Sequence, residues 1–199
     1  VQSFGQNGVV DLKQNNDQQI DPMSTEIGLH ATPMVAGNVV IVGAAHRSGG
    51  VPTGKTNVKG YIRGFDVRTG KRLWIFHTIP SPGEFGNETW LKDSWSYTGN
   101  TGAWGQFSID AELGIAYLPV ESATGDYFGA DRPGNNLFGN SLVALDIHTG
   151  TMQWYFQITH HEIWDWDLPS APILADLPDG GVVTKDNVDK FLTLAEWPG

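Results

Sequence analysis

Short apolar runs separated by turn residues recur along this chain, and no long helical pattern interrupts them. Two such runs lie within 32–43, T-P-M-V-A-G-N-V-V-I-V-G, on either side of Gly37-Asn38. This dipeptide supplies the positive φ that a two-residue hairpin loop requires. The pattern therefore predicts a β-hairpin at 32–43, and it predicts many short strands joined by tight turns elsewhere.

One motif occurs twice, as G-F-D-V-R-T-G-K-R-L-W at 64–74 and as A-L-D-I-H-T-G-T-M-Q-W at 144–154. The Asp carboxylate of each copy can accept hydrogen bonds from backbone N–H groups of the turn, and the Gly can take the left-handed conformation that closes it. The Trp falls on the returning strand, where its indole can present an apolar face to a neighbouring sheet. A third turn, at 110–114, keeps the same Asp-to-Gly spacing.

The hairpins alternate with long loops at 77–103 and 121–140, and long loops on a repetitive scaffold are where function usually lies. A sheet of about four strands cannot bury both faces alone and must stack on similar sheets, which favours an all-β fold of the β-propeller type. We predict a blade portion at 31–76, a blade at 104–156, the start of a further blade at 157–178 and an unassigned tail at 179–199. Since a propeller typically has about 4–8 blades, we expect these two to three blades to be too few to close a ring.

Composition and charge limit the partners and the chemistry. The formal net charge is −10 and no basic residues cluster, which disfavours nucleic acid and anionic membrane surfaces as partners. The absence of cysteine excludes disulfides, thiolate metal sites and thiol nucleophiles within these residues. No apolar run approaches the roughly 20 residues of a membrane helix, so any membrane anchor is expected outside this chain. The first residues contain neither an initiator Met nor a signal peptide, and we expect a fragment or a processed product.

The densest group of polar and aromatic residues is T-H-H-E-I-W-D-W-D-L-P at 159–169. A zinc-protease helix is excluded, because Asp165 stands where H-E-x-x-H needs its second His. As an extended segment, this stretch would place Asp165 and Asp167 on one side, and carboxylates among indoles can be desolvated and become proton acceptors. The alternative is that the Asp residues cap a turn and the Trp residues pack between blades. A metal site built from His160 and His161 is disfavoured, since adjacent strand residues point in opposite directions.

Trp104 lies in N-T-G-A-W-G-Q-F-S-I-D, next to small residues and on a segment that we expect to be an inner strand. Small neighbours would let a flat ligand lie against the indole. From the pattern alone, a tryptophan of the core explains this position better than a ligand contact does.

These segments together resemble the pyrroloquinoline-quinone (PQQ)-dependent dehydrogenases, and most of all their membrane-bound glucose dehydrogenase branch. The resemblance runs from about residue 4 to about residue 177. Its motifs are G-Q-N-G-V-V-D-L at 5–12, I-R-G-F-D-V-R-T-G-K-R-L-W at 62–74, W-G-Q-F-S-I-D-A-E-L-G-I-A-Y-L-P at 104–119, the repeat at 144–154 and H-H-E-I-W-D-W-D-L-P at 160–169. The repeat alone is shared with non-catalytic propellers, whereas the repeat, the Trp104 segment and H-H-x-x-W-D-x-D-L-P in this order are far more specific.

The resemblance implies an eight-bladed propeller in the periplasm that holds PQQ and a Ca²⁺ or Mg²⁺ ion near its axis. Trp104 matches the family's tryptophan under the quinone ring, and Asp165 matches its proposed general base. That base would take the hydroxyl proton of a sugar or alcohol while a hydride passes to the quinone, whose carbonyl the metal polarises. Thr124 falls where this branch places a contact to the cofactor or the metal. Electrons would then leave for a quinone or a cytochrome.

The chain departs from the family pattern at two expected metal ligands. The loop after 40–43 offers His46, Ser48 and Gly49 where relatives have an acidic or amide ligand. Alcohol-oxidising relatives have an Asn after the strand at 115–120, where this chain has Glu121-Ser122, and Glu121 could serve as an oxygen ligand instead.

Three hypotheses follow, and an enzyme or a piece of one ranks first. The second is a non-catalytic propeller of the cell envelope that binds other proteins. Such a scaffold would have no need of Trp104 or of the segment at 160–169. The third, a hydrolase that uses Asp165 and Asp167, has only their proximity in its favour. We expect the 199 residues by themselves to show little or no turnover.

Overall fold

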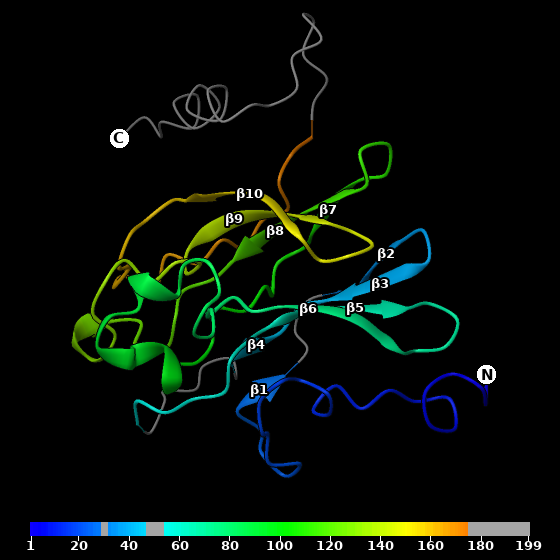
Figure 1. Cartoon of the computed structure of the whole chain (residues 1–199), viewed down its shortest axis with the longest axis horizontal. Helices are drawn as coiled ribbons and strands as arrows, with labels where there is room; N and C mark the ends of the chain where they lie inside the picture. The colour runs from blue at the N-terminus through cyan, green and yellow to red at the C-terminus, as the bar shows by residue number, and fades with distance from the viewer. Residues whose placement is uncertain (29–31, 47–53, 175–199) are drawn as a thin grey trace, which may run out of the picture.

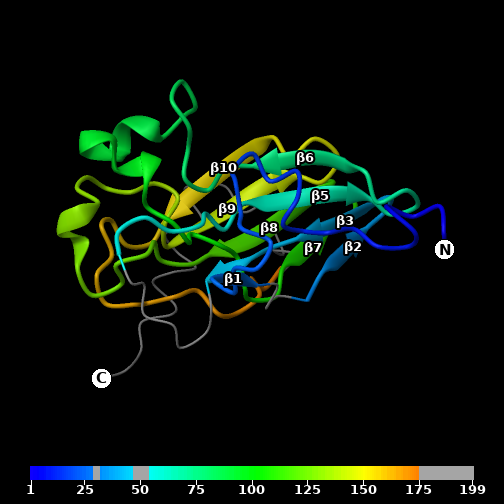
Figure 2. The same cartoon turned by 90° about the horizontal axis from the view of Figure 1, so that it is seen from below.

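The computed structural model describes residues 1–28, 32–46 and 54–174. Within these ranges the regular structure is β-sheet with three short 3-10 helices, so the predicted all-β class is confirmed. Two antiparallel sheets of four strands stack on each other (Figures 1 and 2). The described residues contain no helix that is long and apolar enough to cross a membrane.

The first sheet has the order β2-β3-β5-β6 and lies within the predicted blade portion. Its strands are β2 (Met34–Ala36), β3 (Val39–Val42), β5 (Ile62–Asp66) and β6 (Arg72–Phe76). Ala36 pairs with Val39 across the predicted two-residue loop, and Gly37 has φ 57°. The hairpin at 32–43 is therefore confirmed.

The second sheet follows chain order, because each strand pairs with the next one in sequence. Its strands are β7 (Ser108–Asp110), β8 (Ile115–Val120), β9 (Ser141–Asp146) and β10 (Met152–Gln157). The described residues after β10 form no strand. The predicted tail at 179–199 and the last part of the segment predicted at 157–178 lie outside the described ranges.

The main hydrophobic core lies between the two sheets. It combines Ile41 and Ile62 of the first sheet with Ala116, Leu118 and Val143 of the second, all of them inaccessible to solvent. Each of the buried Ile, Leu and Val side chains contributes roughly 1.5–3 kcal/mol relative to an exposed one. The core therefore holds the sheets together, and the loops at their ends are supported by it.

The predicted turns have the expected chemistry. One carboxylate oxygen of Asp66 accepts hydrogen bonds from the backbone N–H groups of Arg68 and Thr69, at 3.0 and 2.7 Å. Gly70 closes the turn with φ 70°. Asp110 likewise accepts from two backbone N–H groups of its own turn. The three turns lie at one end of the sheets (Figure 1).

The long loops lie at the opposite end of the sheets (Figures 1 and 2). They contain the 3-10 helices η1 (Asn87–Thr89), η2 (Leu91–Ser96) and η3 (Gly129–Asp131). A smaller core of Tyr61, Ile79, Trp90 and Ala123 supports them, and the Trp90 indole donates a hydrogen bond to the Leu137 carbonyl. The loops that follow β6 and β8 are thus packed against each other.

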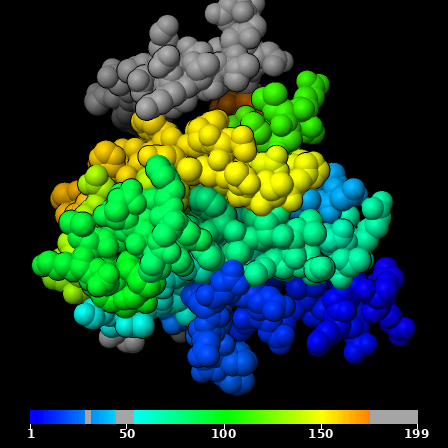
Figure 3. Space-filling view, viewed as in Figure 1, coloured from blue at the N-terminus to red at the C-terminus, as the bar shows by residue number. Residues whose placement is uncertain are grey.

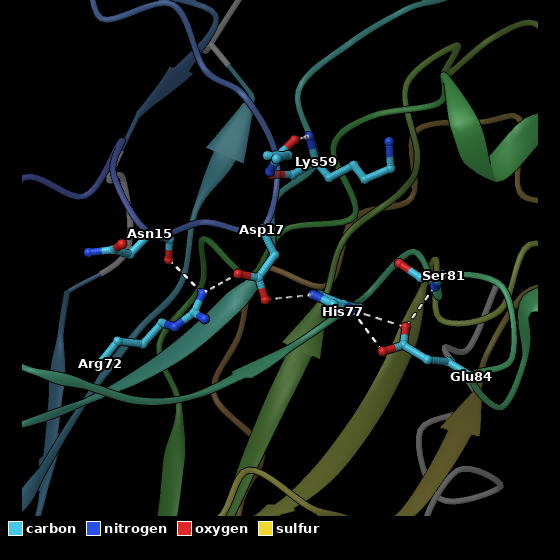
Figure 4. Close-up of polar contacts among 8 residues, drawn as sticks. Asn15, Asp17, Lys59, Arg72, His77, Ser81 and Glu84 are labelled. Carbon is cyan, nitrogen blue, oxygen red and sulfur yellow. Dashed lines mark hydrogen bonds and ion pairs between the residues drawn. The ribbon is translucent and has the colours of Figure 1, made fainter.

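The polar N-terminal segment runs along the first sheet (Figure 3). Asp17 accepts a hydrogen bond from Arg72 of β6 at 2.8 Å and faces the His77 ring at 3.4 Å. The other ring nitrogen of His77 lies 2.9 Å from Glu84 (Figure 4). Two short strands, β1 (Ile27–Gly28) and β4 (Ala45–His46), also pair, and β4 lies in the segment after 40–43 that was predicted as loop.

Candidate functional site

Trp104 lies in the connection that precedes β7, and not on a strand as predicted. Its side chain is half-buried and belongs to neither hydrophobic core, so it is not the core tryptophan that the pattern favoured. A Cβ added at Gly105 would come within 2.8 Å of the Pro169 carbonyl oxygen. The glycine beside Trp104 therefore allows the backbone of the 165–169 segment to pack directly against it.

Asp167 joins these two parts of the chain. One of its carboxylate oxygens accepts a hydrogen bond from the Trp104 indole N–H at 3.1 Å, and the other accepts one from the Ser122 backbone N–H at 3.0 Å. The three residues come from three separate segments, and Trp104 is 63 positions from its partner. Sequence analysis placed Asp167 beside Asp165 but did not find this role.

Asp165 has a different environment. Its side chain is exposed, and one carboxylate oxygen accepts a hydrogen bond from the hydroxyl of the exposed Tyr127 at 3.0 Å. Its backbone has φ 60°, and that of His161 has φ 49°. These left-handed residues interrupt the extended conformation, so the predicted alternation of sides along 160–169 is wrong.

The tryptophans beside Asp165 do not desolvate it. Trp164 and Trp166 are 65% and 63% exposed, and neither packs in the interior described here. Within the described residues, these two indoles therefore neither bury Asp165 nor pack between the two sheets. At the surface, the Asp165 carboxylate is contacted by the hydroxyl of the exposed Tyr127.

A buried pair, Glu162 and Arg132, fixes the shape of the segment, and sequence analysis missed both residues. The Glu162 carboxylate accepts hydrogen bonds from the Ser122 hydroxyl and the Trp164 backbone N–H. The Arg132 guanidinium donates to the Glu162 carbonyl and, at 3.2 Å, to the Thr124 carbonyl. Nothing in the local sequence marks these residues, because the contacts join loops that are distant along the chain.

Three carboxyl groups at this end of the second sheet have raised pKa values. Burial, followed by the charge of Asp167, raises the pKa of Glu121 well above its ordinary value. Burial and the charges of Asp165 and Asp167 raise the pKa of Asp126 to about 6. Burial also raises the pKa of Asp167, against the hydrogen bond from Ser122. A cation here would relieve the repulsion between these groups.

The predicted metal and cofactor contacts fit this site to different degrees. One carboxylate oxygen of Glu121 is buried and has no hydrogen-bond partner, which suits a cation ligand. The Thr124 hydroxyl accepts hydrogen bonds from the Gly99 backbone N–H at 3.0 Å and the Asn57 amide at 3.3 Å. Thr124 would have to give up one of these bonds to bind a metal, but its own proton can still be donated to a ligand.

Glu121 by itself is not a complete metal site. No three His, Asp or Glu side chains in the ranges 1–28, 32–46 and 54–174 are arranged to hold an ion. Ser48 and Gly49, in the loop where relatives carry a ligand, lie outside these ranges. Calcium takes about 6–8 oxygen ligands, so the described residues would supply only part of the coordination shell of a calcium ion.

Residues 1–187 match the PQQ family described as "Glucose/ethanol/alcohol dehydrogenase, beta-propeller domain". The chain belongs to this family, and its fold is that of a PQQ-type β-propeller. The resemblance inferred from the motifs is confirmed.

Several characterised proteins are similar to the chain over most of its length. Quinoprotein glucose dehydrogenase A of Acinetobacter calcoaceticus is 37% identical over 87% of this chain, and quinoprotein glucose dehydrogenase of Escherichia coli K12 is 34% identical over 90%. The solved quinohemoprotein alcohol dehydrogenase of Pseudomonas putida HK5 superposes with a TM-score of 0.62, at 31% identity over 75% of this chain. The chain covers 21%, 22% and 23% of these three proteins, respectively.

Proposed function

We propose that the chain forms part of the cofactor site of a PQQ-dependent dehydrogenase that oxidises a sugar or alcohol hydroxyl group. The observation that carries this proposal is the contact between the Trp104 indole and Asp167, which brings the two most specific motifs of the sequence together. Glu121 and the exposed Asp165 both lie near Asp167: the charge of Asp167 raises the pKa of Glu121, and the charge of Asp165 raises the pKa of Asp167.

The roles of the side chains follow from their surroundings. Trp104 is half-buried outside the cores, so one face of its indole can support a flat heterocycle. Asp165 is exposed, and the Tyr127 hydroxyl binds one of its two carboxylate oxygens, so the other can accept a proton from a substrate hydroxyl. Thr124 can donate its hydroxyl proton to a polar group of the cofactor.

When bound, PQQ would supply the two-electron acceptor that the twenty amino acids lack. Glu121 would neutralise part of the charge of a Ca²⁺ or Mg²⁺ ion held beside it. Its buried, unpartnered oxygen is the observation that favours an ion at this place. We also propose a quinone or cytochrome as the electron acceptor and the periplasm as the location, on the strength of the family alone.

Cofactor binding is the first test. We expect PQQ with Ca²⁺ or Mg²⁺ to quench the tryptophan fluorescence of the chain, and Trp104→Phe to weaken the binding of PQQ. Trp154→Phe is the matched control, since Trp154 is also half-buried but lies on the second sheet, away from the loops. Equal PQQ affinity in the wild type and Trp104→Phe would exclude Trp104 as a support for the cofactor.

Turnover is the second test, and it uses the full-length gene product because the chain spans about a fifth of its relatives' length. With PQQ and Ca²⁺, we expect dye reduction by glucose or by simple alcohols, and comparison of the two substrates assigns the class. Asp165→Asn should lower kcat by roughly 10²–10⁴-fold, the range for a lost general base. Full activity of this variant would remove Asp165 from the mechanism.

The same measurements separate the enzyme from a non-catalytic scaffold of the cell envelope. A scaffold would neither bind PQQ nor reduce the dye, and substitutions at Trp104 and Asp165 would leave its binding of other proteins unchanged. The mutually repelling carboxyl groups of the buried Glu121 and the half-buried Asp167 favour the enzyme, because a scaffold gains nothing from them.

A further inference from the structure

Asp167 uses both oxygens of its carboxylate on the protein itself. One oxygen accepts the Trp104 indole N–H and the other accepts the Ser122 backbone N–H, at 3.1 and 3.0 Å. By contrast, within the described residues the exposed Asp165 accepts one hydrogen bond, from the hydroxyl of the likewise exposed Tyr127 at 3.0 Å. The two carboxylates of W-D-W-D are therefore suited to different tasks.

The anchor at Ser122 is itself firmly held. The Ser122 hydroxyl binds the buried Glu162, and its carbonyl accepts the Thr101 backbone N–H at 3.1 Å. The backbone N–H of Glu121, directly before it, donates to the Gly102 carbonyl at 2.9 Å, and the Glu121 carbonyl accepts the Asn140 backbone N–H at 3.1 Å. A hydrogen bond to this backbone thus fixes the Asp167 carboxylate relative to the second sheet.

The segment that carries Asp167 is fixed on both sides. The Asn140 side chain donates to the Trp166 carbonyl, and the Ser108 hydroxyl of β7 donates to the Pro172 carbonyl. The backbone at Pro169 also lies against Gly105, the residue after Trp104. The backbone around Asp167 is therefore held in place by contacts on both sides of the position where its carboxylate binds Trp104.

The indole of Trp104 depends on this contact for its orientation. Its chain neighbours, Ala103 and Gly105, are too small to clamp a ring, and the ring belongs to neither core cluster. A tryptophan side chain rotates about two bonds, so a fixed partner for the N–H sets the plane of the ring. A charge-assisted hydrogen bond is also about twice as strong as a neutral one.

We infer that Asp167 is a positioning residue that holds the Trp104 indole in the plane required to support the cofactor, while Asp165 is left free to act as the base. This inference rests on the proposed function for its second half, the effect on the cofactor. Its first half, the orientation of the indole, is independent of any cofactor.

The first experiment tests the orientation without cofactor. The chain has eight tryptophans, so a ¹⁵N-labelled sample gives eight indole N–H signals, and Trp104→Phe identifies the signal of Trp104. In Asp167→Ala we expect this signal to move and its exchange with solvent to become at least about tenfold faster. Asp167→Asn should restore it in part, because the amide retains one acceptor oxygen.

Two other indoles and one other carboxylate serve as controls. The Trp74 and Trp90 indoles donate to the carbonyls of Ile147 and Leu137, so their signals should stay in place in every variant. Asp126→Asn removes a nearby carboxylate that has no bond to Trp104, and it should leave the Trp104 signal unmoved. An unchanged Trp104 signal in Asp167→Ala overturns the inference, and so does a loss of the Trp74 and Trp90 signals, since the effect would then be global.

The second experiment tests the consequence for the cofactor. We expect Asp167→Ala to raise the dissociation constant of PQQ about tenfold, and Asp167→Asn to give an intermediate value. If Asp167→Ala moves the indole signal but binds PQQ like the wild type, the orientation of Trp104 does not serve cofactor binding and the inference fails. If the wild type does not bind PQQ, the proposed function fails, and the indole signals still decide whether Asp167 positions Trp104.

Discussion

The two copies of the repeated motif end in tryptophans with different surroundings. Trp74 is 6% exposed, and its indole donates to the Ile147 carbonyl of the other sheet at 3.0 Å. Trp154, at the same place in the second copy, is half-buried. The centroid of its ring lies 5.8 Å from that of Tyr117, which belongs to the same sheet. The same local sequence thus gives a buried residue in one sheet and a partly exposed one in the other.

The turns before these tryptophans are nearly identical. The Thr69 backbone N–H donates to Asp66 at 2.7 Å, and that of Thr149 donates to Asp146 at 2.8 Å. The closing glycines, Gly70 and Gly150, have φ 70° and 69°. The difference between the two copies therefore begins after the turn.

The neighbouring sheet and one residue account for the difference. Trp74 lies against Gly150 of the second sheet, where a Cβ would come within 2.6 Å of its ring. It pairs across its own sheet with Gly64, whereas Trp154 pairs with Ala144. A Cβ at position 64 would come within 2.2 Å of the Trp74 ring, so only the first copy lets the indole lie flat on its strand.

The largest effect should come from truncation of the two tryptophans. We expect Trp74→Ala to lower the free energy of unfolding by about 3–5 kcal/mol, because it opens a cavity between the sheets and leaves the Ile147 carbonyl unpaired. Trp154→Ala should cost clearly less, since its ring is already partly in water. Denaturant unfolding of both variants measures the difference, and equal losses would show that the two environments are energetically alike.

A smaller effect should come from exchanging the two paired residues. Gly64→Ala should cost about 1–3 kcal/mol, because the added methyl group overlaps the Trp74 ring. The matched control, Ala144→Gly, should cost roughly 0.5–1 kcal/mol, the usual price of glycine in a strand. If Gly64→Ala is as mild as its control, the contact with Gly64 does not decide how Trp74 packs.

The smallest effect should come from the aspartates of the turns, and here the two copies should agree. Hydrogen bonds from Thr69 lower the pKa of Asp66, and those from Thr149 lower the pKa of Asp146. A lowered pKa in the folded state means that the contribution to stability is present above about pH 4 and is lost as the pH falls through the folded pKa. Asp66→Ala and Asp146→Ala should therefore each lower Tm by roughly 2–4 °C at pH 7, with a smaller effect near pH 3.

Thermal unfolding of the two aspartate variants at both pH values provides the measurement. Asp110→Ala, in the third turn, is a useful reference because its carboxylate accepts the same two types of backbone bond. Unequal effects at Asp66 and Asp146 would contradict the view that the turns are independent of the sheets around them.

The candidate site shows the same division between local and distant contacts. The family resemblance implied that Trp104 and Asp165 serve the same cofactor, and the Asp167 bond joins Trp104 to the 160–169 segment. The pattern failed at the level of conformation, because the left-handed backbone at His161 and Asp165 has no signature in an alternating sequence. It also missed Glu162 and Arg132, whose polar side chains are buried only because they bind each other's loops.

The sequence by itself determined the elements whose partners lie a few residues away. The Gly37-Asn38 hairpin and the three Asp-to-Gly turns form because the interacting groups are neighbours, and the resemblance of the motifs identified the family. Only the tertiary structure decided which tryptophan is buried, which carboxylate binds the Trp104 indole and which carboxyl groups are desolvated. Burial and charge depend on what segments far along the chain bring to the same place, and a local pattern contains no information on that.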